Sequence, residues 1–290
     1  MTFTGPDLNT VIEAESARDR QPPMIVVSSG RSKWIREQLE ASRDGYTTAI
    51  TKDDGGYRVD RPLEPIYAPK SAGPNRGVYV VVHQSEVRTY QRDLRGLGVE
   101  VVGFSFGQPL KGKGLIGKTP KDVELVGFGA ARYAAISFAK DIRGRLPQDG
   151  DAPRNPWNQA WVMDDTVVGL KNLPVSEHVD ADDITQVTPD FRAAETVLGD
   201  DYVLAFGGGT RAKPAAEIQN EMNKSLATPS ADLQGPKERG IIQQAALWNI
   251  ERMADEKRNF SPIFFASAED VSMTNHFNPA DRDAPPPYQF

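Results

Sequence analysis

The chain has no cysteine, three histidines and no apolar run of bilayer length among its 290 residues. The absence of cysteine excludes disulfides and thiolate metal sites, and it suits a reducing compartment. No segment reaches the roughly 20 consecutive apolar residues that a transmembrane helix needs. The first residues also lack the basic and apolar regions of a secretory signal peptide. We therefore expect no membrane association and a cytoplasmic location.

An excess of positive charge is also lacking, since 34 Lys and Arg residues stand against 40 Asp and Glu residues. The net charge of −6 argues against strong non-specific binding to nucleic acid, which needs a basic surface, but it allows a local basic loop. The hydrophobic fraction of 39% and the charged fraction of 26% are typical of a globular protein. The length fits one large α/β domain, or one and a half ordinary ones.

Apolar runs and helical patterns alternate through the first 168 residues. Short β-branched runs predict buried strands, and apolar positions at helical spacing predict the helices between them. The resulting order predicts an α/β fold with a doubly wound, mostly parallel sheet flanked by helices. The predicted strands cover 24–27, 78–83, 99–104 and 160–163, and the helices cover 32–45, 85–95 and 127–142.

The second half of the chain alternates less clearly. We expect a helix over 189–198, a strand over 202–206 and a long helix over 237–257. The expected organisation is an N-terminal arm or short helix (1–22), a single domain (23–280) and a flexible Pro-rich tail (281–290).

The most informative feature is a pair of adjacent acids, Asp164 and Asp165, at the exit of the predicted strand 160–163. Adjacent carboxylates repel each other unless a cation or basic groups lie between them. Ligands of α/β proteins usually bind at strand ends, so the pair is a candidate site for a divalent metal and a phosphorylated ligand. The alternative is a surface turn with solvated acids, and this stretch alone leaves both readings open.

Four short motifs occur in order along the chain. They are Ser28-Ser29-Gly30-Arg31 after the first predicted strand, Gly127-Phe128-Gly129-Ala130-Ala131-Arg132 at a helix start, Trp161-Val162-Met163-Asp164-Asp165, and Glu269-Asp270 followed by His276. Together they resemble the glycosyltransferases of the GT-A fold. Within that fold they are similar to the base J glucosyltransferases and related phage enzymes that glycosylate hydroxymethylated pyrimidines in DNA. The resemblance covers roughly residues 24–277.

The resemblance implies a GT-A-like domain with a nucleotide-sugar-binding half (23–168) and an acceptor-side half (169–280). The implied donor is a nucleotide-diphosphate sugar of the UDP-glucose type, and a hydroxymethylated pyrimidine in DNA is the first candidate acceptor. A phage-encoded chain would act in the host cytoplasm. The sequence does not determine the oligomeric state.

The resemblance also implies site roles. A Mn²⁺ or Mg²⁺ ion would be held by Asp165 and His276, and Asp270, with Glu269 as second choice, would be the catalytic base. The implied nucleotide and phosphate contacts are Ser28, Gly30, Arg31, Arg132 and Asp164. Because the departing diphosphate gains negative charge, either a metal ion or basic side chains must stabilise it.

One residue departs from the pattern of the family. Thr166 follows the acid pair where a further carboxylate is common, and a hydroxyl binds Mg²⁺ or Mn²⁺ more weakly than a carboxylate does. Thr166 therefore leaves open a non-catalytic nucleotide-binding protein of the same fold. A sugar-nucleotide nucleotidyltransferase is a second alternative, because sugar-nucleotide pyrophosphorylases also use acids on this type of sheet.

Overall fold

The computed structural model describes most of the first half of the chain and selected segments of the second. No helix within these residues is long and apolar enough to cross a membrane. The described residues are 1–16, 20–44, 50–53, 56–59, 64–106, 128–146, 155–171, 185–186, 188, 190–199, 203–205, 209–211 and 245–260.

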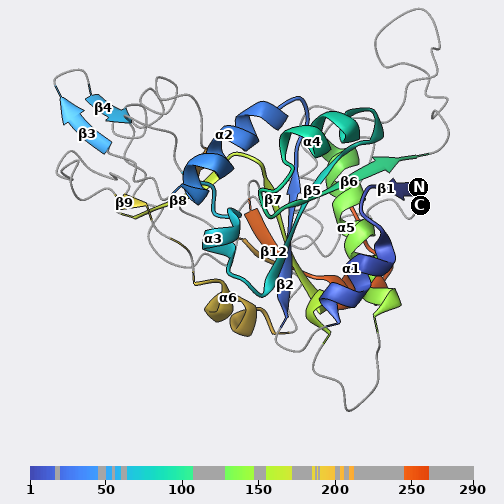
Figure 1. The fold of residues 1–290 in the computed structure, drawn as a ribbon. Helices are drawn as coiled ribbons and strands as arrows, with labels where there is room; N and C mark the ends of the chain where they lie inside the picture. The colour runs from blue at the N-terminus through green and yellow to red at the C-terminus, as the bar shows by residue number, and fades with distance from the viewer. Residues whose placement is uncertain are drawn as a thin grey trace, which may run out of the picture.

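Four parallel strands form the middle of a seven-stranded mixed sheet (Figure 1). Their order across the sheet is β6 (Glu100–Ser105), β5 (Arg76–His83), β2 (Gln21–Val27) and β7 (Gln159–Asp164). All four carry near-continuous apolar runs, which suits strands that are covered on both faces. The strands predicted in these four places are confirmed, as is the α/β class with helices on both sides of the sheet. The prediction of a mostly parallel sheet is wrong for the described strands, because three pairings of this sheet are parallel and three are antiparallel.

Three further strands complete the sheet at its two ends. Next to β7 lies β12 (Ala245–Asn249), which is antiparallel to it, followed by β10 (Val203–Ala205). At the other edge β1 (Thr2–Thr4) pairs antiparallel with β6. The predicted N-terminal arm thus contains an edge strand, and the second half of the chain adds strands to the same sheet as the first half.

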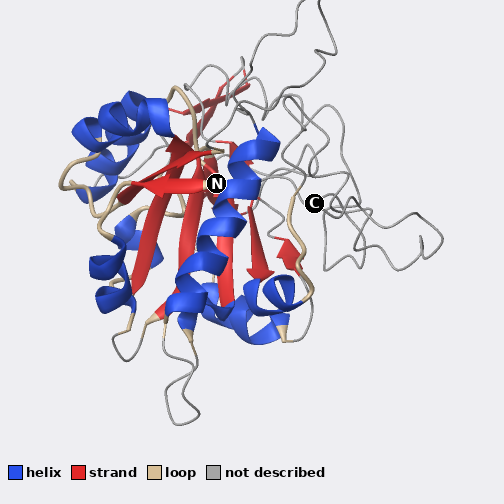
Figure 2. Cartoon of the chain, turned by 90° about the vertical axis from the view of Figure 1, so that its right-hand side faces the viewer, coloured by secondary structure: helices blue, strands red, loops and turns tan. Residues whose placement is uncertain are grey.

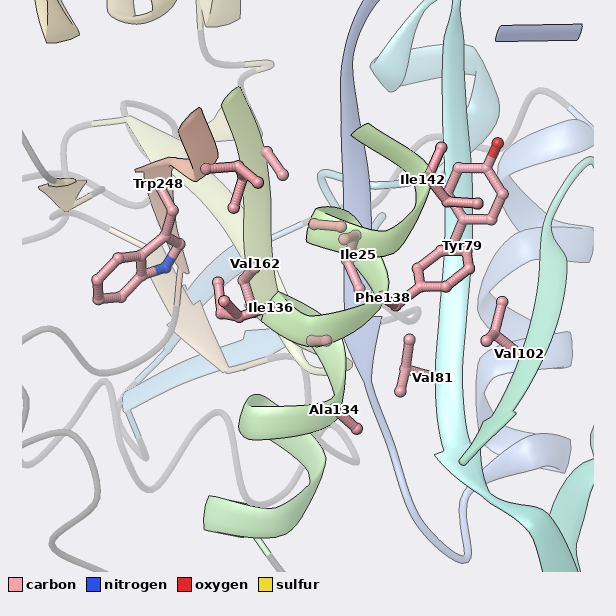
Figure 3. Packing of buried hydrophobic residues seen from close by; sticks show 14 of the residues in the cluster. Ile25, Tyr79, Val81, Val102, Ala134, Ile136, Phe138, Ile142, Val162 and Trp248 are labelled. Atoms are coloured by element: carbon pink, nitrogen blue, oxygen red, sulfur yellow. The ribbon is translucent and has the colours of Figure 1, made fainter. Parts of the chain in front are cut away.

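Helices cover both faces of the sheet (Figure 2). The α2–α4 layer buries its apolar residues against Met24 and Val26 of β2, and the α5 layer does so against Ile25 and Val27. Figure 3 shows Phe138 of α5 beside Tyr79 and Val81 of the sheet. The α2–α4 layer holds α2 (Ser32–Arg43), α3 (Pro69–Ala72), α4 (Val87–Asp93) and α6 (Phe191–Leu198), and the α5 layer holds α1 (Leu8–Glu15), α5 (Phe128–Arg145) and α8 (Ile250–Asp255).

The remaining elements are short. A 3-10 turn (Gln84–Glu86) leads into α4, and another (Pro156–Asn158) leads into β7. Two small sheets lie apart from the main one: β3 (Ile50–Asp53) with β4 (Gly56–Val59), and β8 (Val167–Lys171) between β9 (Thr185–Gln186) and β11 (Gly209–Arg211).

The predicted helix over 237–257 is wrong for residues 245–249, and residues 237–244 lie outside the described residues. Residues 245–249 form β12, and only Ile250–Asp255 is helical, as α8. All five residues of β12 are buried, because the strand lies between β7 and β10 with helices on both faces. A run that is apolar on every side fits a buried strand as well as a buried helix, so periodicity alone cannot separate them.

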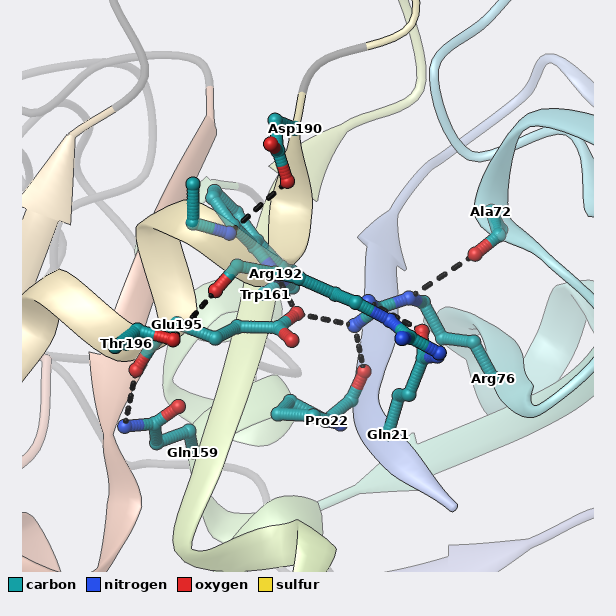
Figure 4. A network of polar contacts seen from close by, with 11 residues as sticks. Gln21, Pro22, Ala72, Arg76, Gln159, Trp161, Asp190, Arg192, Glu195 and Thr196 are labelled. Carbon is teal, nitrogen blue, oxygen red and sulfur yellow. Dashed lines mark hydrogen bonds and ion pairs between the residues drawn. The ribbon is translucent and has the colours of Figure 1, made fainter. Parts of the chain in front are cut away.

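A buried polar network holds α6 against the amino-terminal ends of the strands (Figure 4). Arg76, whose side chain is 1% exposed, donates to Glu195 of α6 at 2.6 Å and also to Gln21 and the Pro22 carbonyl. Trp161 of β7 donates to the same Glu195 carboxylate at 2.9 Å. Because a buried charge is tolerated only when it is paired and hydrogen-bonded, this network fixes α6 to β2, β5 and β7.

Lys140 of α5 generates a prediction on pH and stability. Its ammonium group donates to the Arg258 carbonyl, and burial lowers its pKa from 10.5 to about 8. Between these two pH values the unfolded chain binds more protons, so this group's contribution to stability rises with pH in that window. The free energy of unfolding of the wild type, relative to Lys140→Met, is therefore expected to rise from pH 8 to pH 10.5 in urea titrations. Parallel curves for the two proteins would contradict this.

Candidate functional site

The order of the parallel strands creates a topological switch point between β2 and β7. From β2 the chain proceeds through β5 to β6 on one side, and it then returns through α5 to β7 on the other side. Ligands of open α/β sheets bind in the crevice outside the carboxyl ends of the strands at such a point. At that point residues 28–31 follow β2. Asp164 is the last residue of β7 and pairs with Val27 of β2, and Asp165 comes directly after it.

Asp165 is the centre of the contacts at the carboxyl ends of β2 and β7. Its side chain is 3% exposed, and both of its oxygens accept hydrogen bonds. The Ser28 hydroxyl donates to Oδ2 at 2.6 Å, and the Arg31 guanidinium donates to Oδ1 at 2.6 Å. The acid at the end of β7 is thus joined to the loop after β2, and the surface-turn reading does not hold for Asp165.

Two tyrosines support this arrangement, and sequence reasoning missed both. Tyr90 of α4 lies within 2.8 Å of the Ser28 hydroxyl, and its own hydroxyl accepts the Arg31 backbone N–H at 2.9 Å. Tyr67 donates to the Asp165 carbonyl at 2.7 Å. Tyr67 lies in a stretch without a clear pattern and Tyr90 on the apolar side of a helix, so neither carried a sequence signal.

Burial is the largest cause of the pKa shifts of Asp165, Tyr67 and Tyr90. Burial raises the pKa of the Asp165 carboxyl, while the Ser28 hydrogen bond and the Arg31 charge act in the opposite direction. Burial also raises the pKa of both tyrosines, which therefore stay protonated and able to donate near neutral pH.

The Ser29-Gly30 turn binds a second carboxylate. The Gly30 N–H donates to Glu86 at 2.6 Å, and the Ser29 hydroxyl donates to the same side chain at 3.0 Å. Gly30 has a φ of +68°, a region that disfavours side chains, and this conformation turns its N–H toward the residues that follow β5. The loop after β2 therefore presents donors that bind an oxyanion.

Asp164 points to the other face of the sheet, as the alternation along β7 requires. Arg132, in the second turn of α5, donates to Asp164 Oδ1 at 3.1 Å, and both side chains are largely buried, at 8% and 15% exposure. The guanidinium carbon of Arg132 also lies 6.0 Å from the ring centre of Phe260. Each acid of the pair therefore holds one arginine, and the two arginines come from opposite helix layers.

The described residues do not fit a divalent metal well. Both Asp165 oxygens have donors, one of them a cation, and no group of three or more His, Asp or Glu side chains is placed to bind a metal among them. The predicted metal ligand His276 lies outside the described residues, so the metal stays a prediction.

The predicted catalytic acids cannot be placed. Glu269 and Asp270 lie outside the described residues, like His276, while the structure brings Ser28, Arg31 and Asp165 together and sets Arg132 on Asp164. Comparisons of the chain with models of protein families, with curated proteins and with solved structures found no match.

Ser28 provides a stability prediction. Ser28→Ala removes a hydrogen-bond donor from the buried Asp165 carboxylate and a partner from Tyr90, which should lower the free energy of unfolding by about 1–3 kcal/mol. Urea unfolding at constant m-value measures the loss. The control is Ser29→Ala, which removes an exposed hydroxyl and should cost less than about 0.5 kcal/mol. Equal losses in both variants would contradict a supporting role for the Ser28 hydroxyl.

Proposed function

We propose that this chain is a glycosyltransferase with a GT-A-like fold, which transfers a sugar from a nucleotide-diphosphate donor to an acceptor hydroxyl. The observation that carries the proposal is the switch point, where the loop after β2 meets the acid pair that ends β7. The resemblance of the sequence motifs to glycosyltransferases supplies the reaction class. The four parallel strands, in the order third, second, first and fourth along the chain, support the same nucleotide-binding architecture.

The local chemistry suits a diphosphate. The amino-terminal ends of α2 and α5 lie at the carboxyl ends of the parallel strands, beside the acid pair, because α2 follows β2 and α5 precedes β7. Helix amino-terminal ends favour anions, and the Arg31 guanidinium, whose side chain is 49% exposed, lies at the amino-terminal end of α2. These features favour a ligand with a phosphate group over a neutral one.

The proposed reaction transfers the sugar to an acceptor oxygen. The bond between the sugar C1 and the diphosphate oxygen breaks with its electron pair on the diphosphate, and the acceptor oxygen bonds to C1. The acceptor proton passes to a general base, which we propose to be Asp270, with Glu269 as second choice. The proposed acceptor is a hydroxymethylated pyrimidine in DNA, and a Mn²⁺ or Mg²⁺ ion on Asp165 and His276 remains part of the prediction from the resemblance.

Donor binding is the first test. UDP-glucose at one hundred times its Kd is expected to stabilise the protein against unfolding by about 2.7 kcal/mol, because it binds only the folded state. Thermal unfolding with UDP-glucose, GDP-glucose and dTDP-glucose, each with and without MnCl₂, measures this effect. Free glucose is the matched control and should leave the transition unchanged. No stabilisation by any nucleotide sugar would overturn the proposed function.

Transfer is the second test, read by mass spectrometry of hydroxymethylated DNA incubated with protein and donor. Asp270→Asn is expected to lower the transfer rate about 10²–10⁴-fold with an unchanged donor Kd, because the lost general base acts only on the acceptor. Glu269→Gln is the matched control and should retain transfer. Loss in Glu269→Gln alone would reassign the base. Release of pyrophosphate from UTP and glucose 1-phosphate would favour the nucleotidyltransferase alternative instead.

A further inference from the structure

We propose that Arg31 binds the diphosphate group directly and takes the place of a divalent cation, while Asp165 positions its guanidinium group. This inference rests on the proposed function, since it concerns the diphosphate of the same donor. It assigns Asp165 a positioning role, which differs from the metal-ligand role that the resemblance implies for it.

The burial of the Arg31 ion pair is the first observation. The Asp165 side chain is 3% exposed, whereas the Arg31 side chain is 49% exposed. One guanidinium nitrogen of Arg31 donates to the acid, and a guanidinium carries five N–H donors in a planar fork. A cation that is fixed on its inner side by a buried acid and open to solvent on its outer side is prepared to bind a phosphate in two-point geometry.

The occupancy of Asp165 is the second observation. Its two oxygens accept from Ser28 and Arg31 at 2.6 Å each, so a metal ion bound there would displace a donor or lie beside a guanidinium of like charge. Thr166, which follows directly, offers a hydroxyl in place of a further carboxylate. The position that a metal would occupy on this carboxylate is therefore taken by Arg31.

The second arginine at the acid pair differs from Arg31 in exposure. The Arg132 side chain is 8% exposed, donates to Asp164 at 3.1 Å and lies against the Phe260 ring. Because this pair is enclosed, the proposed contact with the diphosphate rests on Arg31.

The test measures binding of UDP and of inorganic pyrophosphate by calorimetry on the full chain, in EDTA and at equal free ligand concentration in MnCl₂. Wild-type Kd values are expected to agree within about threefold between the two conditions. Arg31→Gln is expected to weaken both ligands about tenfold to a hundredfold in EDTA, because charge-assisted hydrogen bonds to phosphate are lost. Arg36→Gln is the matched control, since it removes the same charge from an exposed position on the same helix.

Asp165→Asn separates the two readings. The asparagine oxygen still accepts from Arg31, so pyrophosphate binding in EDTA is expected to stay within about threefold of wild type. The double variant Arg31→Gln/Asp165→Asn removes the pair without leaving a buried unpaired acid, and it should bind as weakly as Arg31→Gln.

Each outcome decides between the proposals. Binding that requires Mn²⁺, is abolished by Asp165→Asn and survives Arg31→Gln would overturn this inference and leave the glycosyltransferase proposal standing. Absence of binding to wild type under both conditions, with UDP and with pyrophosphate, would overturn the proposed function and this inference together.

Discussion

The parallel pairing of β2 with β7 is the constraint on which the candidate site depends. In strand order β5 and β6 lie on one side of β2 and β7 on the other, and α2 follows β2 on one face of the sheet whereas α5 precedes β7 on the other face. The loop after β2 and the end of β7 lie at the same level, with Val27 opposite Asp164. Ser28 and Asp165, which lie far apart in the sequence, thereby come within 2.6 Å of each other.

Buried charges are arranged differently at the amino-terminal and the carboxyl ends of the parallel strands. At the amino-terminal ends, the Arg76 side chain is 1% exposed and its partners come from β2 and α6, so it holds these two elements together. At the carboxyl ends, the acid is buried but its arginine is half exposed. A fully enclosed pair contributes to the arrangement of the fold, whereas a pair with one face in water retains donors for a ligand. This difference in exposure distinguishes Arg31 from Arg76 and supports the proposal that Arg31 contacts a ligand.

The two acids lie in different elements. Asp164 is the last residue of β7 and contacts Arg132 of α5, whereas Asp165 lies in the turn that follows and contacts Ser28 and Arg31. Each acid then has its own arginine, and the repulsion between adjacent carboxylates is offset without a metal ion.

The sequence by itself determined the parallel strands, most of the helices and the strand-end position of the acid pair, because buried runs and helical spacing are local signals. It placed Ser28 and Arg31 directly after the first parallel strand and Arg132 in the helix before β7, and their role toward a phosphate stays a prediction. It did not separate β12 from a helix, because a strand buried on both faces has no period of its own. Tyr67, Tyr90 and Glu86 gave no signal. Only the tertiary structure decided which arginine each acid holds and which partner reaches solvent, because those contacts join segments that the chain alone does not bring together.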